Sequence, residues 1–349
     1  MMLLLAAVLT GCGSGILFAP GTGESGIGED PGAAEAPAPD HHTITVGFSQ
    51  LGAESDWRSA NTQSMLEAFD TDGYTLLYQN GQQKQSNQIT AIRTFIQQEV
   101  DYIVLAPATE TGWDTVLEEA RDAGIPVILV DRRVDVADRS LYTCWVGSDF
   151  ELESIKATAW LDAYTAKKGV STDEVRIVNI QGTIGSTAQI GRTRGLANAV
   201  RANDWELLAQ MSGDFTQTKG REVMAAFLQR FDDAIRVVYC ENDNEAIGAI
   251  EAIESAGLTA GPDIDRGDLL VISFDGTSRE ALQLAREGRI ACIAECNPLH
   301  GPRVRALIEM LERGETPEKF NYVEERIFSA LPEVREITVN GQRCEVEEP

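Results

Sequence analysis

The chain has 349 residues, of which 43% are apolar and 24% are charged, and its formal net charge is −26 at pH 7. Because so acidic a surface repels phosphates, a DNA or RNA partner is not expected. The length is sufficient for one large core, or for two of about half that length each. The 31 glycines and the low aromatic content of 7% suit an α/β protein with many tight turns.

The first residues have the pattern of a lipoprotein export signal. Residues 1–10 are mostly apolar, and Leu9-Thr10-Gly11-Cys12 is a lipobox, in which small residues fit the signal peptidase and the cysteine thiol accepts the lipid. We predict that residues 1–12 form this signal and that cleavage leaves Cys12 as the lipid-anchored first residue, outside the cytoplasm. The alternative is a cysteine that occurs in the leader by accident. Residues 13–42, rich in Gly, Pro, Ala and Glu, are predicted to be a flexible tether between the membrane and a folded domain.

The cysteine and histidine spacing gives no support for a metal site. Besides Cys12, the chain contains Cys144, Cys240, Cys292, Cys296 and Cys344. The number is odd, so at least one thiol is free or pairs between molecules. Cys292 and Cys296 are predicted to lie on one strand about 13 Å apart, too far for a disulfide; whether any other pair forms stays open. No CxxC pair occurs, and His41 and His42 are interpreted as a solvated linker end, so neither a metal nor a cofactor is expected.

Short apolar runs alternate with helical patterns along the chain. The first array of predicted elements comprises strands at 44–48, 75–78, 102–105 and 127–130 and helices at 57–70, 86–99 and 112–123. The second comprises strands at 175–180, 207–208, 237–239, 269–274 and 290–294 and helices at 190–203, 217–231, 244–256 and 278–287. A helix at 298–313 and tail strands at 322–323 and 337–339 complete the lobes. Continuous β-branched and leucine runs require parallel sheets covered on both faces, so the pattern predicts an α/β fold of two doubly wound lobes.

Polar side chains recur where the predicted strands end, which is the edge at which open parallel sheets bind ligands. In the first array these candidates are Gln50, Glu54, Trp57, Arg58, Asp131 and Arg132, and in the second they are Arg192, Asn242, Asp275 and Glu295. Carboxylates accept from sugar hydroxyls, guanidinium groups donate in a fixed fork, and amides do both. Rings such as Trp57, Phe48 and Phe215 can cover the C–H faces of a sugar. Since acids balance arginines, the set favours a neutral polyol over a phosphate or carboxylate.

Several of these residues also have a simpler explanation. Asp275 precedes Gly276 and fits a turn, while Asp131 and Arg132 fit a surface ion pair of little energetic value. Trp57 fits a core position, Asn242 a helix cap, and Arg192 a solvated helix face. Their shared placement at strand ends in both arrays favours a binding site.

Longer strings around these positions are similar to a known family. They include Val46-Gly47-Phe48-Ser49-Gln50, Gly81-Gln82-Gln83-Lys84-Gln85, Ser212-Gly213-Asp214-Phe215-Thr216 and Asp275-Gly276. Between about residues 44 and 325 the chain resembles the type I periplasmic sugar-binding proteins of ABC transporters, and among them the galactofuranose-binding group. The resemblance implies two lobes joined by a three-segment hinge, with boundaries at 43–148 plus 297–325 and at 149–296 plus 326–349.

The resemblance also implies which side chains contact a sugar. The implied contacts are Glu54, Trp57, Arg58, Asp131, Arg132, Arg192, Asn242 and Asp275, with Phe48, Gln50 and Phe215 as further candidates and Glu295 at the crossing between lobes. Asp56 and Gly191 depart from the family pattern beside presumed contacts. The identity of the sugar therefore stays open, with a galactofuranose-like sugar or another hexose or pentose as candidates.

The predicted function is that of a monomeric, lipid-anchored receptor that captures a monosaccharide and delivers it to an ABC transporter permease. One alternative is a receptor that signals to a membrane sensor. An enzyme acting on a sugar is disfavoured, because His300 is the only histidine beyond the tether and Gly182-Thr183-Ile184-Gly185 lacks the phosphate-loop signature. A sugar-responsive regulator would need a basic DNA-binding region before the first lobe, where this chain has an acidic tether.

Overall fold

A computed structural model describes residues 42–349, so the predicted signal peptide, Cys12 and most of the predicted tether lie outside the described residues. Two six-stranded sheets dominate the described part, in the orders β11-β5-β4-β3-β1-β2 and β12-β10-β9-β8-β6-β7. Apart from β12, which pairs antiparallel with β10, every strand of both sheets is parallel to its neighbours. Each sheet is doubly wound, which confirms the predicted α/β class with two parallel-sheet lobes.

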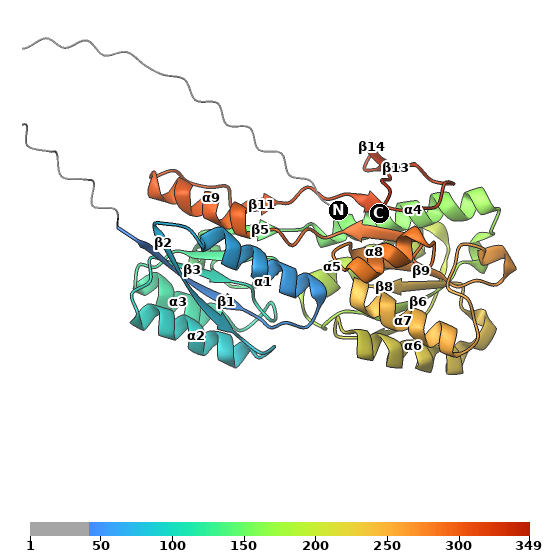
Figure 1. Ribbon diagram of the computed structural model, residues 1–349, viewed down its shortest axis with the longest axis horizontal. Helices are drawn as coiled ribbons and strands as arrows, with labels where there is room; N and C mark the ends of the chain where they lie inside the picture. Colours follow the sequence, from blue (N-terminus) through green and yellow to red (C-terminus); the bar gives the residue numbers. More distant parts are fainter. Residues whose placement is uncertain (1–41) are drawn as a thin grey trace, which may run out of the picture. The chain divides into compact units, whose positions relative to one another are not determined.

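The helices and strands of the first lobe come from two separate parts of the chain. They are β1 (Ile44–Gln50), α1 (Asp56–Phe69), β2 (Tyr74–Asn80), α2 (Gln85–Gln97), β3 (Tyr102–Leu105), α3 (Asp114–Asp122), β4 (Val127–Val130) and β5 (Cys144–Gly147), followed much later by α9 (Gly301–Glu312) and β11 (Phe320–Tyr322). In Figure 1 the orange-red α9 and β11 lie beside the blue and cyan elements of this lobe.

The second lobe contains the middle of the chain and its end. Its elements are α4 (Phe150–Lys168), β6 (Arg176–Gln181), α5 (Thr187–Asn203), β7 (Glu206–Ser212), α6 (Gln217–Phe231), β8 (Val237–Cys240), α7 (Asp243–Ser255), β9 (Leu270–Asp275), α8 (Arg279–Arg286), β10 (Cys292–Glu295), β12 (Ile327–Phe328), β13 (Glu336–Val339) and β14 (Gln342–Glu345). The last two form a hairpin, whose Ile337 and Val339 share a core with Leu161 of α4.

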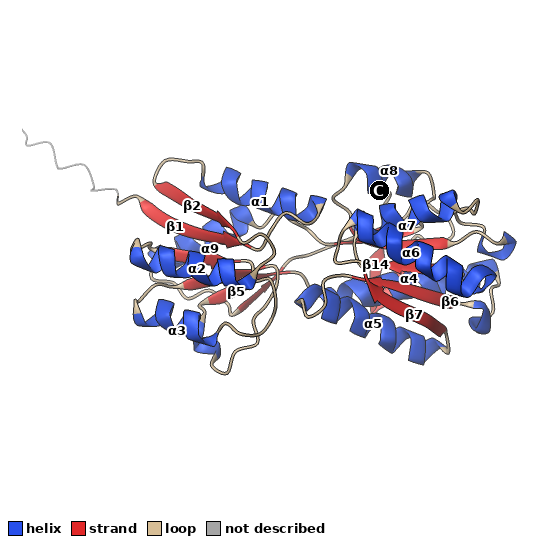
Figure 2. Ribbon diagram, turned by 90° about the horizontal axis from the view of Figure 1, so that it is seen from below, coloured by secondary structure: helices blue, strands red, loops and turns tan. Residues whose placement is uncertain are grey.

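Both faces of each sheet are covered by helices (Figure 2). In the first lobe, Ile103 on one face of β3 packs in a core with Phe95 of α2, and Val104 on the other face packs in a core with Met65 of α1 and Ile308 of α9. Two further clusters cover the two faces of the second sheet. The uninterrupted apolar runs of β3 and β4 follow from this double coverage, because neither face of these strands meets water.

Three segments cross between the lobes. The first joins β5 to α4 at residues 148–149, the second joins β10 to α9 at residues 296–300, and the third joins β11 to β12 at residues 323–326. Although β11 and β12 are neighbours in the chain, they belong to different sheets. The result is a three-segment hinge.

The sequence prediction missed β5 and α4. The strand β5 has the sequence Cys-Trp-Val-Gly, with a single β-branched residue, and the buried face of α4 mixes apolar side chains with Glu153, Ser154 and Thr158, which weakens its apolar period. The ends of α4 are nevertheless well marked, because the Asp149 side chain accepts from the Leu152 N–H and Gly169 closes the helix in the left-handed conformation.

The end of β10 also corrects the prediction. The strand covers 292–295 and not 290–294, so Cys296 lies beyond it, where the chain leaves the sheet for the second crossing. All five cysteines between residues 42 and 349 are free, and four of them are buried. The described part of the chain is therefore stabilised by its apolar cores without disulfide bonds.

The capping residues explain why two helices begin at other residues than predicted. Ser186 accepts from the Gln189 N–H, so α5 begins at residue 187, earlier than predicted. The helix α9 begins only at Gly301, with Pro302 in its first turn, where a missing N–H costs nothing. Between residues 42 and 349, no helix combines the length and apolar character needed to cross a membrane.

The helices α6 and α7 pack closely at Gly248, where a Cβ atom would lie 2.1 Å from the Gln217 carbonyl oxygen. We expect Gly248→Ala to lower the free energy of unfolding by about 3 kcal/mol, because the two helices must separate to admit the methyl group. Denaturant unfolding of the purified protein measures the change. Thr218→Ala, at an exposed position of α6, is the control and should stay within about 0.5 kcal/mol of wild type. Equal stability of the two variants would contradict this packing.

Candidate functional site

A pocket lies between the carboxyl ends of the two sheets. Its lining comes from both lobes and from the second crossing: Glu54, Ser55, Trp57, Arg58, Asp131, Arg132, Phe150, Ala188, Arg192, Phe215, Asn242, Asp275 and Cys296. This is the edge at which parallel sheets bind ligands. Its floor is built from two buried charge clusters, one in each lobe.

The cluster of the first lobe is centred on Arg58 of α1. Its Nε donates to Glu54 Oε1 at 3.1 Å and its Nη2 donates to Asp131 Oδ2 at 2.5 Å. Burial alone would lower the pKa of Arg58, but the two carboxylates outweigh it and raise this pKa above its usual value. Arg132 Nη1 donates to the Ala108 carbonyl at 2.8 Å. Burial, together with the charge of Arg58, lowers the pKa of Arg132 to about 10, so both guanidinium groups are cationic at neutral pH.

The cluster of the second lobe is centred on Arg192 of α5. Its Nε donates to Glu153 Oε2 at 2.7 Å and its Nη2 lies 3.3 Å from Asp275 Oδ1. Its Nη1 donates to the Glu241 carbonyl. Burial opposes the charge of Arg192, but Glu153 and Asp275 raise its pKa well above the usual value. Burial also raises the pKa of Asp275, which Arg192 only partly offsets. Arg192 therefore lies on a buried helix face, and the alternative of a solvated position is wrong.

Backbone strain accompanies the charges. Asp131, Phe215 and Asp275 have φ values of 65°, 62° and 94°, in a region that non-glycine residues seldom adopt. Phe215 is held there by two hydrogen bonds: its N–H donates to Glu245 Oε1 at 2.9 Å, and its carbonyl accepts from Asn242 Nδ2 at 3.1 Å. Strained residues of this kind persist where the surroundings fix them, and they cluster at ligand sites.

Three aromatic rings complete the lining. Trp57, Phe150 and Phe215 form one apolar cluster with Ala188 and Cys296. The indole N–H of Trp57 donates to the Cys296 carbonyl at 2.6 Å, which ties α1 to the second crossing. Trp57 is therefore buried, as its core interpretation required, and also exposes part of its ring to the pocket.

Several polar atoms of the pocket have no hydrogen-bond partner in the protein. Glu54 Oε2, Arg58 Nη1 and Arg132 Nε are buried without a hydrogen bond. Because buried polar atoms are nearly always paired, an acceptor and two donors at one place indicate a ligand that both donates and accepts. The lining carboxylates Glu54, Asp131 and Asp275 formally balance three guanidinium groups. Such a pocket has no excess positive charge for an anion and suits a neutral ligand with hydroxyl groups.

Three of the predicted contacts lie away from the pocket. Phe48 and Gln50 share the face of β1 that α1 covers, where Phe48 packs 5.8 Å from the Tyr78 ring and Gln50 Nε2 donates to Asn61 Oδ1 at 3.0 Å. Glu295 accepts two hydrogen bonds from the Arg326 guanidinium beside the third crossing. The pocket begins beyond the last residue of β1, so the strand itself contributes no lining side chain.

Four lining residues were not predicted: Ser55, Phe150, Ala188 and Cys296. Ser55 caps α1 by accepting from the Arg58 N–H at 3.2 Å, a role that its position before a helical pattern could have indicated. Phe150 follows the missed strand β5, and Cys296 follows β10 directly. Correct ends for these two strands would have placed both residues at the binding edge.

The lobes also contact each other at the rim of the pocket. The Asp56 N–H donates to Asn244 Oδ1 at 3.1 Å, and the Arg133 N–H donates to Thr187 Oγ1 at 2.8 Å. A backbone hydrogen bond joins Glu110 N–H to the Gly185 carbonyl at 3.3 Å. The two lobes are therefore closed against each other around the pocket.

His300 and the segment at Gly182, which were considered above as possible catalytic features, make contacts with other protein groups. The ring of His300 is buried 5.7 Å from the Trp57 ring, and its Nδ1 accepts from Asn61 Nδ2 at 3.2 Å. Burial lowers the pKa of His300 to about 4, so this histidine is neutral. The Gly182 N–H, in the segment similar to a phosphate loop, donates to Glu241 Oε2 at 2.9 Å. A buried carboxylate therefore already occupies the donor that a phosphate would require.

Two doubly wound lobes that enclose a polar pocket at a three-segment hinge define a class of ligand-binding receptors. Residues 46–300 match the family model described as a periplasmic binding protein domain, and the chain belongs to this family.

Relatives of known name cover most of the chain. The galactofuranose-binding protein of Escherichia coli is 40% identical over 289 residues, which are 82% of this chain and 87% of the relative. A Mycobacterium smegmatis structure in complex with β-D-fucofuranose is 38% identical with a TM-score of 0.77, covering 82% of this chain and 91% of its own. The arabinose ABC transporter component of Shewanella sp. ANA-3, bound to α- and β-L-arabinofuranose, is 34% identical with a TM-score of 0.76, covering 82% and 92%.

The buried neutral His300 predicts acid destabilisation. In the unfolded chain it binds a proton below about pH 6.5, whereas in the folded protein it does so only near pH 4. Its contribution is therefore complete above about pH 6.5 and falls by up to roughly 3 kcal/mol as the pH drops to about 4. We expect His300→Gln to lose less stability than wild type over this interval in thermal unfolding. His42→Gln, at an exposed histidine, is the control and should follow the wild-type profile; a parallel profile for His300→Gln would refute the assignment.

Proposed function

We propose that this protein is an extracytoplasmic receptor that captures a monosaccharide between its two lobes and delivers it to an ABC transporter. The observation that carries the proposal is the charge-balanced pocket, in which Glu54 Oε2, Arg58 Nη1 and Arg132 Nε are buried without hydrogen-bond partners. Each sugar hydroxyl donates and accepts, so a polyol complements such a mixture better than an anion does. Three aromatic rings in the lining suit the C–H faces of the same ligand.

The furanose ring form is the favoured substrate class. The relatives described above bind galactofuranose, β-D-fucofuranose and L-arabinofuranose according to their names. The proposed contacts are the lining residues Glu54, Trp57, Arg58, Asp131, Arg132, Arg192, Phe215, Asn242 and Asp275. A galactofuranose-like sugar is the first candidate.

Binding is proposed to act by shifting an open–closed equilibrium. Arg132 and Asp131 belong to the first lobe, whereas Arg192 and Asp275 belong to the second, so a ligand held by both pairs bridges the lobes. Only the closed form offers both sets of contacts, and the ligand therefore stabilises closure by its differential affinity. The permease then distinguishes the loaded receptor from the empty one by shape.

The proposal also includes the boundaries of the two lobes and a lipid anchor at Cys12. We assign residues 43–148 plus 297–325 to one lobe and 149–296 plus 326–349 to the other, which agrees with the membership of β11 and β12 in different sheets. Cys12 carries the lipid, and the segment up to residue 42 is the tether that lets a monomeric receptor reach a permease. Both of these features rest on the sequence pattern alone.

Thermal-shift and calorimetric titration of residues 42–349 with pentoses and hexoses in furanose and pyranose forms test the function. We expect stabilisation by a furanose, and no response to any sugar would refute the proposal.

Arg132→Ala and Asp275→Ala should each raise the Kd about 10- to 100-fold, because a charged buried hydrogen bond contributes roughly 1.5–3 kcal/mol. Arg266→Ala, at a side chain that is 77% exposed, and Asp72→Ala, at an exposed position, are charge-matched controls expected to bind like wild type.

The anchor is tested with the full chain expressed in a bacterium that processes lipoproteins. We expect wild type to fractionate with membranes and Cys12→Ala to be released, because the acyl chains supply most of the membrane affinity. Cys344→Ala replaces the partly exposed free cysteine of the described part and should remain with the membranes. Membrane association of Cys12→Ala equal to wild type would exclude lipidation at this residue.

A further inference from the structure

The carboxyl group of Glu325 contacts all three crossings of the hinge. Glu325 itself lies on the third crossing, and its Oε1 accepts from Ser148 Oγ of the first crossing at 2.5 Å and from the Asn297 N–H of the second at 2.8 Å. One oxygen atom therefore fixes the three segments whose relative positions determine how the lobes face each other.

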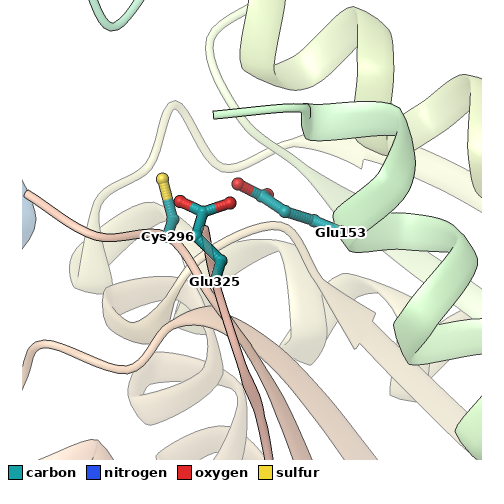
Figure 3. A group of neighbouring side chains, drawn as sticks. All are labelled: Glu153, Cys296 and Glu325. Atoms are coloured by element: carbon teal, nitrogen blue, oxygen red, sulfur yellow. The ribbon is translucent and has the colours of Figure 1, made fainter. Parts of the chain in front are cut away.

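The same carboxyl group faces the charge cluster of the second lobe. Figure 3 shows the carboxyl groups of Glu153 and Glu325 directed toward each other, with the thiol of Cys296 beside them. One carboxyl oxygen of Glu153, one carboxyl oxygen of Glu325 and the sulfur of Cys296 all lie within 4.8 Å of one another. Glu153 is buried, and its Oε1 has no hydrogen-bond partner, while its Oε2 accepts from Arg192. Glu153 thus joins Glu325 at the hinge to Arg192 in the pocket.

The charges around Glu325 favour its neutral form. Glu153 of α4 is the nearest carboxylate, the Cys296 thiol follows β10, and the Arg192 guanidinium of α5 lies beyond Glu153. Lys156 of α4 donates to the Glu325 carbonyl and not to its carboxyl group. Two carboxyl groups so close in a poorly hydrated place cannot both ionise without a large cost. Burial, and then the charge of Glu153, raise the pKa of Glu325 to about 9.

We propose that Glu325 is a positioning residue for ligand binding, which holds the three crossings in the closed arrangement and leaves Glu153 to orient Arg192 toward Asp275. The proposal rests on the proposed sugar-binding function but concerns residues that do not line the pocket, apart from Arg192 and Asp275. Ionised Glu325 would place a second negative charge beside Glu153 and compete with it for Arg192. The neutral form avoids this competition and keeps the pocket cluster intact.

Two substitutions separate the roles of the acceptor and of the charge. Glu325→Gln keeps an oxygen for Ser148 and Asn297 and cannot ionise, so its Kd at about pH 7 should stay within about threefold of wild type. Glu325→Ala leaves the three crossings without their common acceptor, so its Kd should rise about tenfold or more. Calorimetry with the sugar found in the screen measures both. Glu324→Gln and Glu324→Ala, at the exposed neighbouring position on the same crossing, are the matched controls.

The pH profile distinguishes positioning from simple structural support. Glu325 is neutral below its raised pKa, so affinity is present at neutral pH and is lost as the pH rises through about 9. We expect the Kd of wild type, divided by that of Glu325→Gln, to rise about tenfold between about pH 7 and about pH 10. The ratio removes the titration of Arg132, which both proteins share.

The experiments distinguish a failure of the proposed function from a failure of the role proposed for Glu325. If wild type binds no sugar, the proposed function fails first. If wild type binds and Glu325→Ala binds equally well, or if the ratio stays flat with pH, the positioning role is wrong. A lower melting temperature for Glu325→Ala with an unchanged Kd would reduce Glu325 to structural support and also overturn the proposal. Stabilisation of wild type but not of Glu325→Gln by added Zn²⁺ would identify a cation site in place of a proton-bearing carboxyl group.

Discussion

The pocket can exist only because every guanidinium group that leaves water lies against a carboxylate. Arg58 lies between Glu54 and Asp131, and Arg192 lies between Glu153 and Asp275. Removing one member of such a set leaves an uncompensated buried charge, which costs far more than the pair itself contributes. The positions of these six residues are therefore interdependent, and the fold must deliver them together from distant parts of the chain.

The doubly wound sheets meet this requirement through their strand ends. Asp131 follows β4 and Asp275 ends β9, so a carboxylate emerges at the same edge in each lobe. The arginines come from helices or loops that begin at that edge, and the strained backbone at Asp131 and Asp275 directs both acids into the gap. Each lobe thus places a carboxylate at a strand end against an arginine, and the pocket lies between these two arrangements.

Apolar runs made the buried strands and many of the site residues predictable. The strands at 102–105 and 127–130 have the predicted bounds, and Asp131, Arg132 and Asp275 were recognised because they follow such runs directly. The helix α4 was missed because Glu153 and Ser154 occupy its buried face, where their partners come from α5 and β8. Phe48, a further candidate that the resemblance implied, lies in the core between β1 and α1 and outside the pocket lining, because its strand continues to Gln50. Contacts that depend on distant partners, such as Glu325 with Ser148, leave no local pattern.

The late position of α9 and β11 in the chain has a consequence for synthesis. The core beneath β1 and β3 is closed by Val304, Leu307 and Ile308 of α9, which are among the last fifty residues made. During translation the first lobe therefore lacks one of the two helices that cover this face of its sheet until the second lobe has been almost completely synthesised. Long-range closure of this kind delays folding. We therefore expect the first lobe to complete its core after the second lobe and not before it.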